Sequence, residues 1–396
     1  MSKGIGSLLP VLPSYWAFRS LGAPARPPLN FTLSVLYACN SRCMTCNVYE
    51  RKVKIFSVEE YDRFLATVGR VPYWFTLSGG EPFIRKDLVQ IAKVVYERCR
   101  PAIINIPHNG TFPDTTAGRV EEMARACPET EIIINVSLDE LGHRHDEIRG
   151  TKDNFALATR TFESLKALDL PNLTVGIHTV ISKFNVKNFP AIYQGLNAMS
   201  PDSYITEIAE ERDELQTLGT GITPSAGEYG EAIDYLTSQI SRRRFDGVAR
   251  ITQSFRLEYY KLARKSVAFR RQPINCYAGW ASCQISPDGD VWPCCVRGES
   301  AGNLREHGYD FPVIWSGERM NEIRRSIRNK ECACPLANAS YTNIMLSPLA
   351  MAKVGVNYMK LSASALFGAG RNGSAHGSNG AGTGAPKEEG GPGNTS

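Results

Sequence analysis

The sequence lacks any uninterrupted apolar run of about 20 residues, the length that a helix needs to cross a bilayer. Its first residues, MSKGIGSLLPVLPSYWAF, carry one early lysine, but Pro10 and Pro13 break the apolar run and no A-x-A cleavage site follows. We therefore expect neither a spanning helix nor a secretory signal peptide. Two apolar segments, Leu8–Phe18 and Ile344–Phe367, could either pack on the fold or make peripheral contact with a membrane surface.

The chain also lacks a dominant sign of charge. Its 45 Lys and Arg residues face 40 Asp and Glu residues, which leaves a formal net charge of +5. Because the basic residues are scattered among the acids, we expect no nucleic-acid partner. Hydrophobic residues make up 42% and charged residues 21% of the chain, values near the average of globular proteins that exclude collagen-like and wholly disordered chains.

Cysteine is too scarce for a disulfide scaffold of this length, yet its eleven residues are unevenly spread. Three lie close together near the start, six lie between Cys276 and Cys334, and only Cys99 and Cys127 stand alone. Clustered cysteines without a secretory signal indicate metal ligation in a reducing compartment. We therefore expect a cytoplasmic metal-binding protein, with membrane association left open by the two apolar segments.

Composition divides the chain into parts. Residues 1–30 are a Pro-rich lead-in, and residues 368–396 form a Gly-rich tail that cannot bury a core and should be disordered. Strand-like and helix-like patterns alternate over residues 31–220. The parts that follow are a helical linker region at 221–275, a cysteine-rich domain at 276–340 and an apolar segment at 341–367.

The alternating part predicts a parallel sheet. Strands are expected at 31–37, 73–78, 102–107, 131–138, 173–181 and 203–209. Helices are expected at 57–69, 87–98, 116–126, 154–168 and 188–199. Six such βα units exceed a small flavodoxin-like sheet and fall short of a closed eight-stranded barrel. We therefore expect an α/β fold, a partial (β/α)6 TIM-like barrel.

The rest of the chain predicts a different architecture. Two helices are expected at 225–242 and 250–270. The segment ISPDGDVWPC then predicts a β-hairpin that turns at Asp288-Gly289. The barrel should therefore be followed by a small cysteine-rich α+β domain.

The first cysteine cluster forms a loop directly after the first predicted strand. Cys39, Cys43 and Cys46 have the spacing C-x3-C-x2-C. Thiolates select zinc, copper(I) or iron–sulfur clusters, and a structural zinc site normally has a fourth protein ligand, which is missing locally. Three thiolates can bind three irons of a [4Fe–4S] cube and leave the fourth iron open. The spacing therefore favours iron–sulfur over zinc, at the strand end where such barrels carry their chemistry.

This loop and the motifs after it make residues 31–210 resemble the radical S-adenosylmethionine (SAM) superfamily. The C-x3-C-x2-C loop is the superfamily signature, although Thr45 stands where an aromatic residue commonly precedes the last cysteine. Gly79, Gly80, Glu81 and Pro82 follow the second strand and look like the family's GGE-type motif, which holds the SAM amino group. Glycines let backbone carbonyls come close to a ligand, which suits that role. An ordinary Gly-Gly-Pro turn is the alternative.

Three later stretches resemble further SAM-binding positions. Asn109 ends the third strand, where family members often carry Thr-Asn-Gly. Ser137 and Asp139 share one face at the end of the fourth strand, where polar residues of the family contact the SAM ribose. Arg149 resembles an arginine that pairs with the SAM carboxylate, a match for a guanidinium fork. Taken alone, the Asn109 stretch is also a turn signal, and Arg149 could be a solvated loop charge.

The second cysteine cluster resembles the SPASM and twitch domains that follow many radical SAM barrels. A further C-x2-C-x5-C-x3-C run, which a full SPASM domain carries, is missing. The resemblance therefore implies the shorter twitch form with one auxiliary [4Fe–4S] cluster. Its expected ligands are Cys276, Cys294, Cys332 and Cys334. Cys283 or Cys295 could replace one of them, and a zinc site is the alternative.

The resemblance also implies an activity, that of an oxidoreductase or maturase-type enzyme. One electron from a flavodoxin or ferredoxin would cleave SAM at the first cluster, and the resulting 5′-deoxyadenosyl radical would abstract hydrogen from a substrate. A peptide, a small molecule such as a sugar alcohol, and a lipid stay open as substrates. The acid-rich stretch Glu207–Glu214 could face the barrel mouth or be a solvated loop. The alternative to an enzyme is a non-catalytic iron–sulfur or zinc protein.

Overall fold

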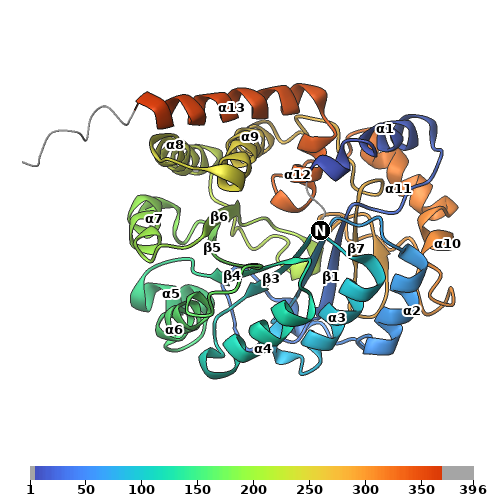
Figure 1. Ribbon diagram of the computed structural model, residues 1–396, viewed down its shortest axis with the longest axis horizontal. Helices are drawn as coiled ribbons and strands as arrows, with labels where there is room; N and C mark the ends of the chain where they lie inside the picture. Colours follow the sequence, from blue (N-terminus) through green and yellow to red (C-terminus); the bar gives the residue numbers. More distant parts are fainter. Residues whose placement is uncertain (1–4, 368–396) are drawn as a thin grey trace, which may run out of the picture.

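A computed structural model describes residues 5–367, so the tail expected to be disordered lies outside the described residues. Its centre is an eight-stranded sheet in the order β6-β5-β4-β3-β2-β1-β7-β8 (Figure 1). The six strands of the barrel are β1 (Asn30–Leu36), β2 (Trp74–Gly79), β3 (Ile103–His108), β4 (Glu131–Ser137), β5 (Leu173–Ile181) and β6 (Ser203–Ile208). They pair in parallel with their neighbours, which confirms the predicted α/β fold, and their ends differ from the predicted ones by at most one residue.

Helices alternate with these strands, as predicted. They are α2 (Val58–Val68), α3 (Leu88–Cys99), α4 (Pro113–Ala126), α5 (Gly142–Arg149), α6 (Asn154–Lys166) and α7 (Phe189–Ala198). The capping box of α2 forms as expected, because Glu60 N–H donates to Ser57 Oγ at 3.3 Å and Ser57 N–H donates to Glu60 Oε2 at 2.8 Å. Short 3-10 turns are η1 (Ile5–Leu8), η2 (Val48–Glu50), η3 (Pro82–Ile84), η4 (Val186–Asn188) and η5 (Asp213–Leu215). Of these six helices, α5 was not predicted.

The β1 strand lies inside the sheet, between β2 and β7. All seven of its residues are buried, which explains why it reads as a continuous apolar run without alternation. Phe31 stacks on Phe75 of β2 with ring centroids 5.3 Å apart. The loop that follows β1 therefore starts from a strand that is packed on all sides.

The predicted hairpin forms and extends the same sheet. Its strands are β7 (Ser282–Ile285) and β8 (Val291–Trp292), and the turn closes where Gly289 N–H donates to the Ser286 carbonyl at 3.0 Å. Because β7 pairs in parallel with β1, the cysteine-rich region continues the sheet at its β1 edge. The two cysteine clusters are thereby attached to neighbouring strands.

The remaining helices are α1 (Leu12–Leu21), α8 (Ala226–Arg242), α9 (Gly247–Phe269), α10 (Phe311–Trp315), α11 (Glu318–Arg328), α12 (Ala337–Met345) and α13 (Pro348–Phe367). The long α13 packs on α9 along one edge of the molecule (Figure 1). The two apolar segments of the sequence meet here, because Trp16 Nε1 donates to the Leu346 carbonyl at 2.9 Å. No helix between residues 5 and 367 is long and apolar enough to cross a membrane.

Candidate active site

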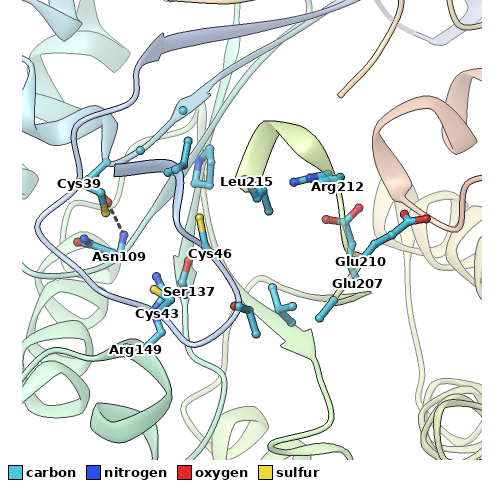
Figure 2. A pocket seen from close by; sticks show the side chains of 18 of the residues that line it. Cys39, Cys43, Cys46, Asn109, Ser137, Arg149, Glu207, Glu210, Arg212 and Leu215 are labelled. Atoms are coloured by element: carbon cyan, nitrogen blue, oxygen red, sulfur yellow. Dashed lines mark hydrogen bonds between the residues drawn. The ribbon is translucent and has the colours of Figure 1, made fainter. Parts of the chain in front are cut away.

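The C-x3-C-x2-C loop leaves the carboxyl end of β1 and borders a cavity of about 180 Å³. The cavity is lined by Cys39, Cys43, Cys46, Gly79, Gly80, Glu81, Asn109, Ser137 and Arg149, among others (Figure 2). These residues come from the ends of four parallel strands and the loops after them, which meet at one edge of the sheet. Pro82 and Asp139, the other two residues predicted to bind SAM, are buried behind this wall.

The cysteine loop is held by α5. Arg42 N–H donates to the Arg149 carbonyl at 3.1 Å, and Met44 N–H donates to the Ile148 carbonyl at 2.9 Å. These two backbone bonds join the loop, on either side of Cys43, to the last turn of the helix. The position of the thiols therefore depends on a helix that the sequence pattern did not reveal.

The Gly79-Gly80 motif packs against the backbone at the base of the cysteine loop. Gly80 N–H donates to the Leu36 carbonyl at 2.8 Å, and Glu81 N–H donates to the Ala38 carbonyl at 3.0 Å. A Cβ atom on Gly80 would lie 2.2 Å from the Ala38 carbonyl oxygen, and one on Gly79 would lie 2.0 Å from that of Leu36. Glycine is required at both positions because backbone approaches backbone here.

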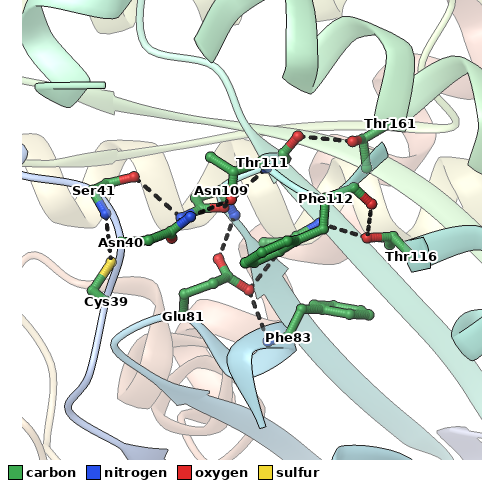
Figure 3. Close-up of polar contacts among 12 residues, drawn as sticks. Cys39, Asn40, Ser41, Glu81, Phe83, Asn109, Thr111, Phe112, Thr116 and Thr161 are labelled. Carbon is green, nitrogen blue, oxygen red and sulfur yellow. Dashed lines mark hydrogen bonds and ion pairs between the residues drawn. The ribbon is translucent and has the colours of Figure 1, made fainter. Parts of the chain in front are cut away.

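Glu81 ties the end of β2 to the end of β3. Its carboxylate, which is 2% exposed, accepts hydrogen bonds from Phe83 N–H at 2.9 Å and from Asn109 N–H at 2.7 Å (Figure 3). His108 Nδ1 lies 2.9 Å from its Oε1 atom, and His108 Nε2 lies 3.1 Å from Thr116 Oγ1. Much of the hydrogen-bonding capacity of this carboxylate is thus used within the protein.

The Asn109 side chain continues this network to the cysteine loop. Its amide donates to Asn40 Oδ1 at 2.8 Å and to Ser41 Oγ at 3.1 Å (Figure 3). Its carbonyl oxygen accepts from Thr111 Oγ1 at 2.7 Å. A continuous set of hydrogen bonds therefore runs from β2 through β3 to the residues beside Cys39.

Arg149 is held in the cavity wall rather than being a solvated loop charge. Its side chain is 12% exposed, and Nη1 pairs with Asp139 Oδ2 at 3.1 Å. The other oxygen of Asp139 accepts from Val180 N–H at 2.8 Å, which fixes the carboxylate. Arg149 Nε is buried and has no hydrogen-bond partner among the described residues. A buried unpaired donor on a cavity wall suits an anionic ligand group, since leaving such a donor unpaired is unfavourable.

The same helix carries two histidines, His143 and His145. His143 is exposed, but His145 is fully buried. Its Nδ1 accepts from Asp139 N–H at 3.1 Å, and its Nε2 lies 3.1 Å from Asn154 Oδ1. Burial lowers the pKa of His145 to about 4, so this ring is neutral at pH 7. His145 therefore supports the backbone of the residue that pairs with Arg149.

The three thiols of the loop suit a metal cluster. Burial raises the pKa of Cys46 to about 12 and also raises the pKa of Cys39 and of Cys43. Such thiols lose their protons when metal binds, and the nearby Arg149 guanidinium opposes the effect of burial at Cys39 and Cys43. Three soft donors around one cavity, with a fixed cation beside them, fit a [4Fe–4S] cluster with one iron open to a ligand.

The opposite side of the cavity is formed by residues after β6. Figure 2 shows Glu207, Glu210 and Arg212 across from Cys39 and Cys43. Burial raises the pKa of Glu210 to about 7, and its Oε2 atom has no hydrogen-bond partner among the described residues. Of the two interpretations of this acid-rich stretch, these three residues fit the one in which it faces the barrel mouth, and the interpretation as a solvated loop is wrong for them. A polar stretch directly after a barrel strand was the signal that could have placed them.

A second cavity, of about 20 Å³, lies beside the first. Its cysteines are Cys276, Cys294, Cys295, Cys332 and Cys334. The four expected ligands are thus together with Cys295, whereas Cys283 Sγ lies within β7, 3.3 Å from the Trp292 carbonyl. Between residues 5 and 367, no three His, Cys, Asp or Glu side chains converge as closely as a single metal ion requires. Five thiols around one cavity fit the sulfur-rich donor set of an iron–sulfur cluster.

Two family models match this chain. A model described as the radical SAM superfamily matches residues 33–196, and a SPASM model, described as an iron–sulfur cluster-binding domain, matches residues 276–335. The chain belongs to the radical SAM superfamily and carries a SPASM domain. It is therefore an enzyme of this superfamily. Its family implies a [4Fe–4S] cluster and SAM, and its SPASM domain binds auxiliary iron–sulfur clusters.

Curated relatives include enzymes with different products. The chain is 32% identical over 162 residues to Fe-coproporphyrin III synthase of Methanosarcina barkeri, a match that spans 39% of this chain and 37% of that protein. It is 26% identical over 314 residues to PqqA peptide cyclase of Granulibacter bethesdensis, covering 74% of each protein. It is also 24% identical to mycofactocin maturase MftC of Mycobacterium tuberculosis, over 77% of this chain and 74% of that protein.

Solved structures support the fold. Streptococcus suis SuiB bound to S-adenosylmethionine matches with a TM-score of 0.56 and 16% identity, covering 81% of this chain and 72% of SuiB. The enzyme anSMEcpe with bound AdoMet matches with a TM-score of 0.53 and 13% identity, covering 86% of this chain and 98% of that one. At these sequence identities, both similarities show a shared fold and nothing more.

Proposed function

We propose that this enzyme binds its catalytic [4Fe–4S] cluster through Cys39, Cys43 and Cys46 and uses SAM to abstract hydrogen from a peptide. The observation that carries the proposal is that these thiols, the Gly79-Gly80 backbone and Arg149 share one cavity at the ends of parallel strands. When bound, the cluster and SAM supply a 5′-deoxyadenosyl radical after one electron arrives from a flavodoxin or ferredoxin.

The chain's own residues would bind and orient SAM. The backbone at Gly79 and Gly80 is open to close approach by the amino group. Arg149 would pair with the carboxylate, using the guanidinium atoms that Asp139 leaves free. Ser137 lines the cavity and would contact the ribose. Glu81 and Asn109 would act mainly by fixing the loops that carry these groups.

The far end of the cavity supports a peptide as the substrate. Glu207 and Glu210 offer carboxylate oxygens, which suit N–H, O–H or ammonium groups. The cation at this end is Arg212, which is itself flanked by these acids and so is poorly placed to bind a tetrapyrrole rich in carboxylates, the kind of compound that the name Fe-coproporphyrin III synthase indicates for one relative. Peptide modification is what the names PqqA peptide cyclase and subtilosin biosynthesis protein indicate for others. The charge of this end therefore favours the peptide-modifying relatives over the haem-forming ones.

The proposed chemistry is tested by SAM cleavage. Protein reconstituted without oxygen and given SAM and dithionite should release 5′-deoxyadenosine. Cys43→Ala should abolish that product while the SPASM domain still holds iron. If the native protein binds the first cluster and still releases no 5′-deoxyadenosine, the proposed chemistry is wrong and a non-catalytic iron–sulfur role is favoured. Mass spectrometry of peptides encoded beside the gene then tests the substrate class.

We also propose that α13 rests on an anionic membrane surface. Leu349, Val356 and Met359 are exposed on this helix, together with Lys353 and Lys360. The sequence of α13 contains these two lysines and no acidic residue. Exposed apolar side chains flanked by lysines match the chemistry of an anionic lipid surface.

A further inference from the structure

The two cavities adjoin, and Arg212 connects them. Arg212 lines the first cavity, and its Nη1 donates to Cys295 Sγ, which lines the second, at 3.2 Å. Leu336 lines both cavities. The guanidinium therefore lies at the boundary between the SAM side of the molecule and the SPASM cysteines.

Three acidic side chains lie around Arg212. Glu214 Oε2 lies 3.7 Å from its Nε atom, and Glu207 and Glu210 line the same cavity. Glu214 is itself fixed in place, because it accepts hydrogen bonds from Gln284 of β7 and from Ser34 of β1. One guanidinium thus lies between three carboxyl groups and the sulfur atoms of the second cavity.

This position has an electrostatic consequence for an iron–sulfur cluster held by the SPASM cysteines. Reduction adds one negative charge to the cluster, and its free energy depends on nearby charges and on hydrogen bonds to sulfur. A buried cation acts strongly on such a charge because the surrounding dielectric constant is low. Arg212 provides both the charge and a hydrogen bond to sulfur, and it offsets the nearby carboxylates.

We propose that Arg212 raises the reduction potential of the auxiliary cluster next to the catalytic cavity. Arg212 would act by placing a positive charge beside the cluster. This effect does not depend on whether Cys295 is a ligand of the cluster or only lies next to it. The proposal rests on the SPASM domain holding a cluster and does not depend on the SAM chemistry proposed above. It gives the polar stretch after β6 a function that the SAM-binding motifs do not supply.

The structure offers a matched arginine for comparison. Arg297 lies beside Cys332 on another side of the cluster cavity. Its charge is already paired, since Arg297 Nε donates to Glu299 Oε1 at 2.6 Å. Arg212 is also ion-paired, to Glu214, but Glu299 is 34% exposed against 8% for Glu214, so solvent screens the charge of Arg297 more than that of Arg212. Arg297→Gln is therefore the control for Arg212→Gln.

The test uses the full chain with Cys39, Cys43 and Cys46 changed to alanine, so that only the auxiliary cluster remains. A redox titration followed by electron paramagnetic resonance measures its midpoint potential. Arg212→Gln should lower the potential by at least the equivalent of a tenfold change in the one-electron equilibrium, 59 mV. Arg297→Gln should lower it less. A failure of SAM cleavage in the native protein would leave these expectations unchanged.

Two outcomes would overturn the proposal. One is an Arg212→Gln protein with native iron content and an unchanged potential. The other concerns Arg212→Lys, which keeps the charge and is measured if the glutamine variant fails to bind iron. Its potential should stay within the equivalent of a tenfold change of the unsubstituted protein, and a larger fall would show that charge at this position is not the determinant.

Discussion

Glu81 and Asn109 lie at the ends of neighbouring strands, and one carboxylate oxygen of Glu81 accepts the backbone N–H of Asn109 at 2.7 Å. The same carboxylate accepts the N–H of Phe83 at 2.9 Å, while the Asn109 side chain reaches Asn40 and Ser41. Glu81, which the GGE-type motif would assign to the SAM amino group, thus also links the end of β2 to the end of β3. Binding and loop geometry are coupled through this one side chain.

Replacing Glu81 by alanine should destabilise the protein, because two buried N–H groups lose their acceptor. Each unsatisfied buried donor costs about 1–3 kcal/mol, so we expect a clear fall in the midpoint of urea unfolding of the iron-free chain. Glu50→Ala, at an exposed position, is the matched control and should leave the midpoint nearly unchanged. Equal midpoints for Glu81→Ala and the native chain would show that the hydrogen bonds of Glu81 between the ends of β2 and β3 do not stabilise the fold.

Replacing Gly80 by alanine should disturb the first cysteine loop and spare the SPASM domain. The new Cβ would lie 2.2 Å from the Ala38 carbonyl oxygen, so the backbone just before Cys39 has to move. We expect iron in the reconstituted protein to fall by about the content of one [4Fe–4S] cluster, with 5′-deoxyadenosine production lost. Gly118→Ala is the control, because nothing lies within 4 Å of a Cβ at that helical position. Full iron content in Gly80→Ala would contradict this account of the motif.

The strand ends and cofactor motifs of this chain could be predicted because their signals are local. A buried strand such as β1 reads as an apolar run, and the cysteine spacing lies within one loop. The polar sequence of α5 has no apolar face, so neither the helix nor the burial of Arg149 was visible. What holds α5 is its set of contacts with the cysteine loop, which lies about 100 residues away in the chain.

Two further features depend on contacts between distant segments. The pairing of β7 with β1 joins residues about 250 positions apart. The sequence of the hairpin does not indicate with which strand of the sheet it pairs. The acids after β6 follow a barrel strand, a position that allows them to face the cavity but does not require it. Only the closing of the barrel against the SPASM cysteines decides that Glu210 and Arg212 point inward.

His145 should make stability depend on pH. Its pKa is lowered to about 4 by burial, against 6.5 for an ordinary histidine, so the unfolded chain binds a proton that the folded chain rejects between these values. Stability contributed by the neutral ring is therefore present above pH 6.5 and lost as pH falls towards 4. The difference between these two pKa values corresponds to about 3 kcal/mol.

Unfolding midpoints of the iron-free chain, measured from pH 7 to pH 4.5, test this dependence. The charged groups that act on His145 are Asp139, Asp146 and Arg149, and they remain in every variant. His145→Gln should flatten the profile relative to the native chain, whereas His143→Gln, on the exposed side of α5, should not. If His145→Gln leaves the pH dependence of the unfolding midpoint unchanged, groups other than His145 cause the loss of stability at low pH.

Membrane contact by α13 should depend on its exposed apolar and basic side chains together. Met359→Glu with Lys360→Glu removes one exposed apolar side chain and reverses one charge, and each change weakens binding to an anionic surface by about 1 kcal/mol or more. Sedimentation with phosphatidylglycerol vesicles should therefore show at least a tenfold loss of affinity. Val53→Glu with Lys54→Glu makes the same change at another exposed pair and should have little effect. Equal losses in both variants would mean that net charge alone drives the binding, and no binding by the native chain would remove the proposal.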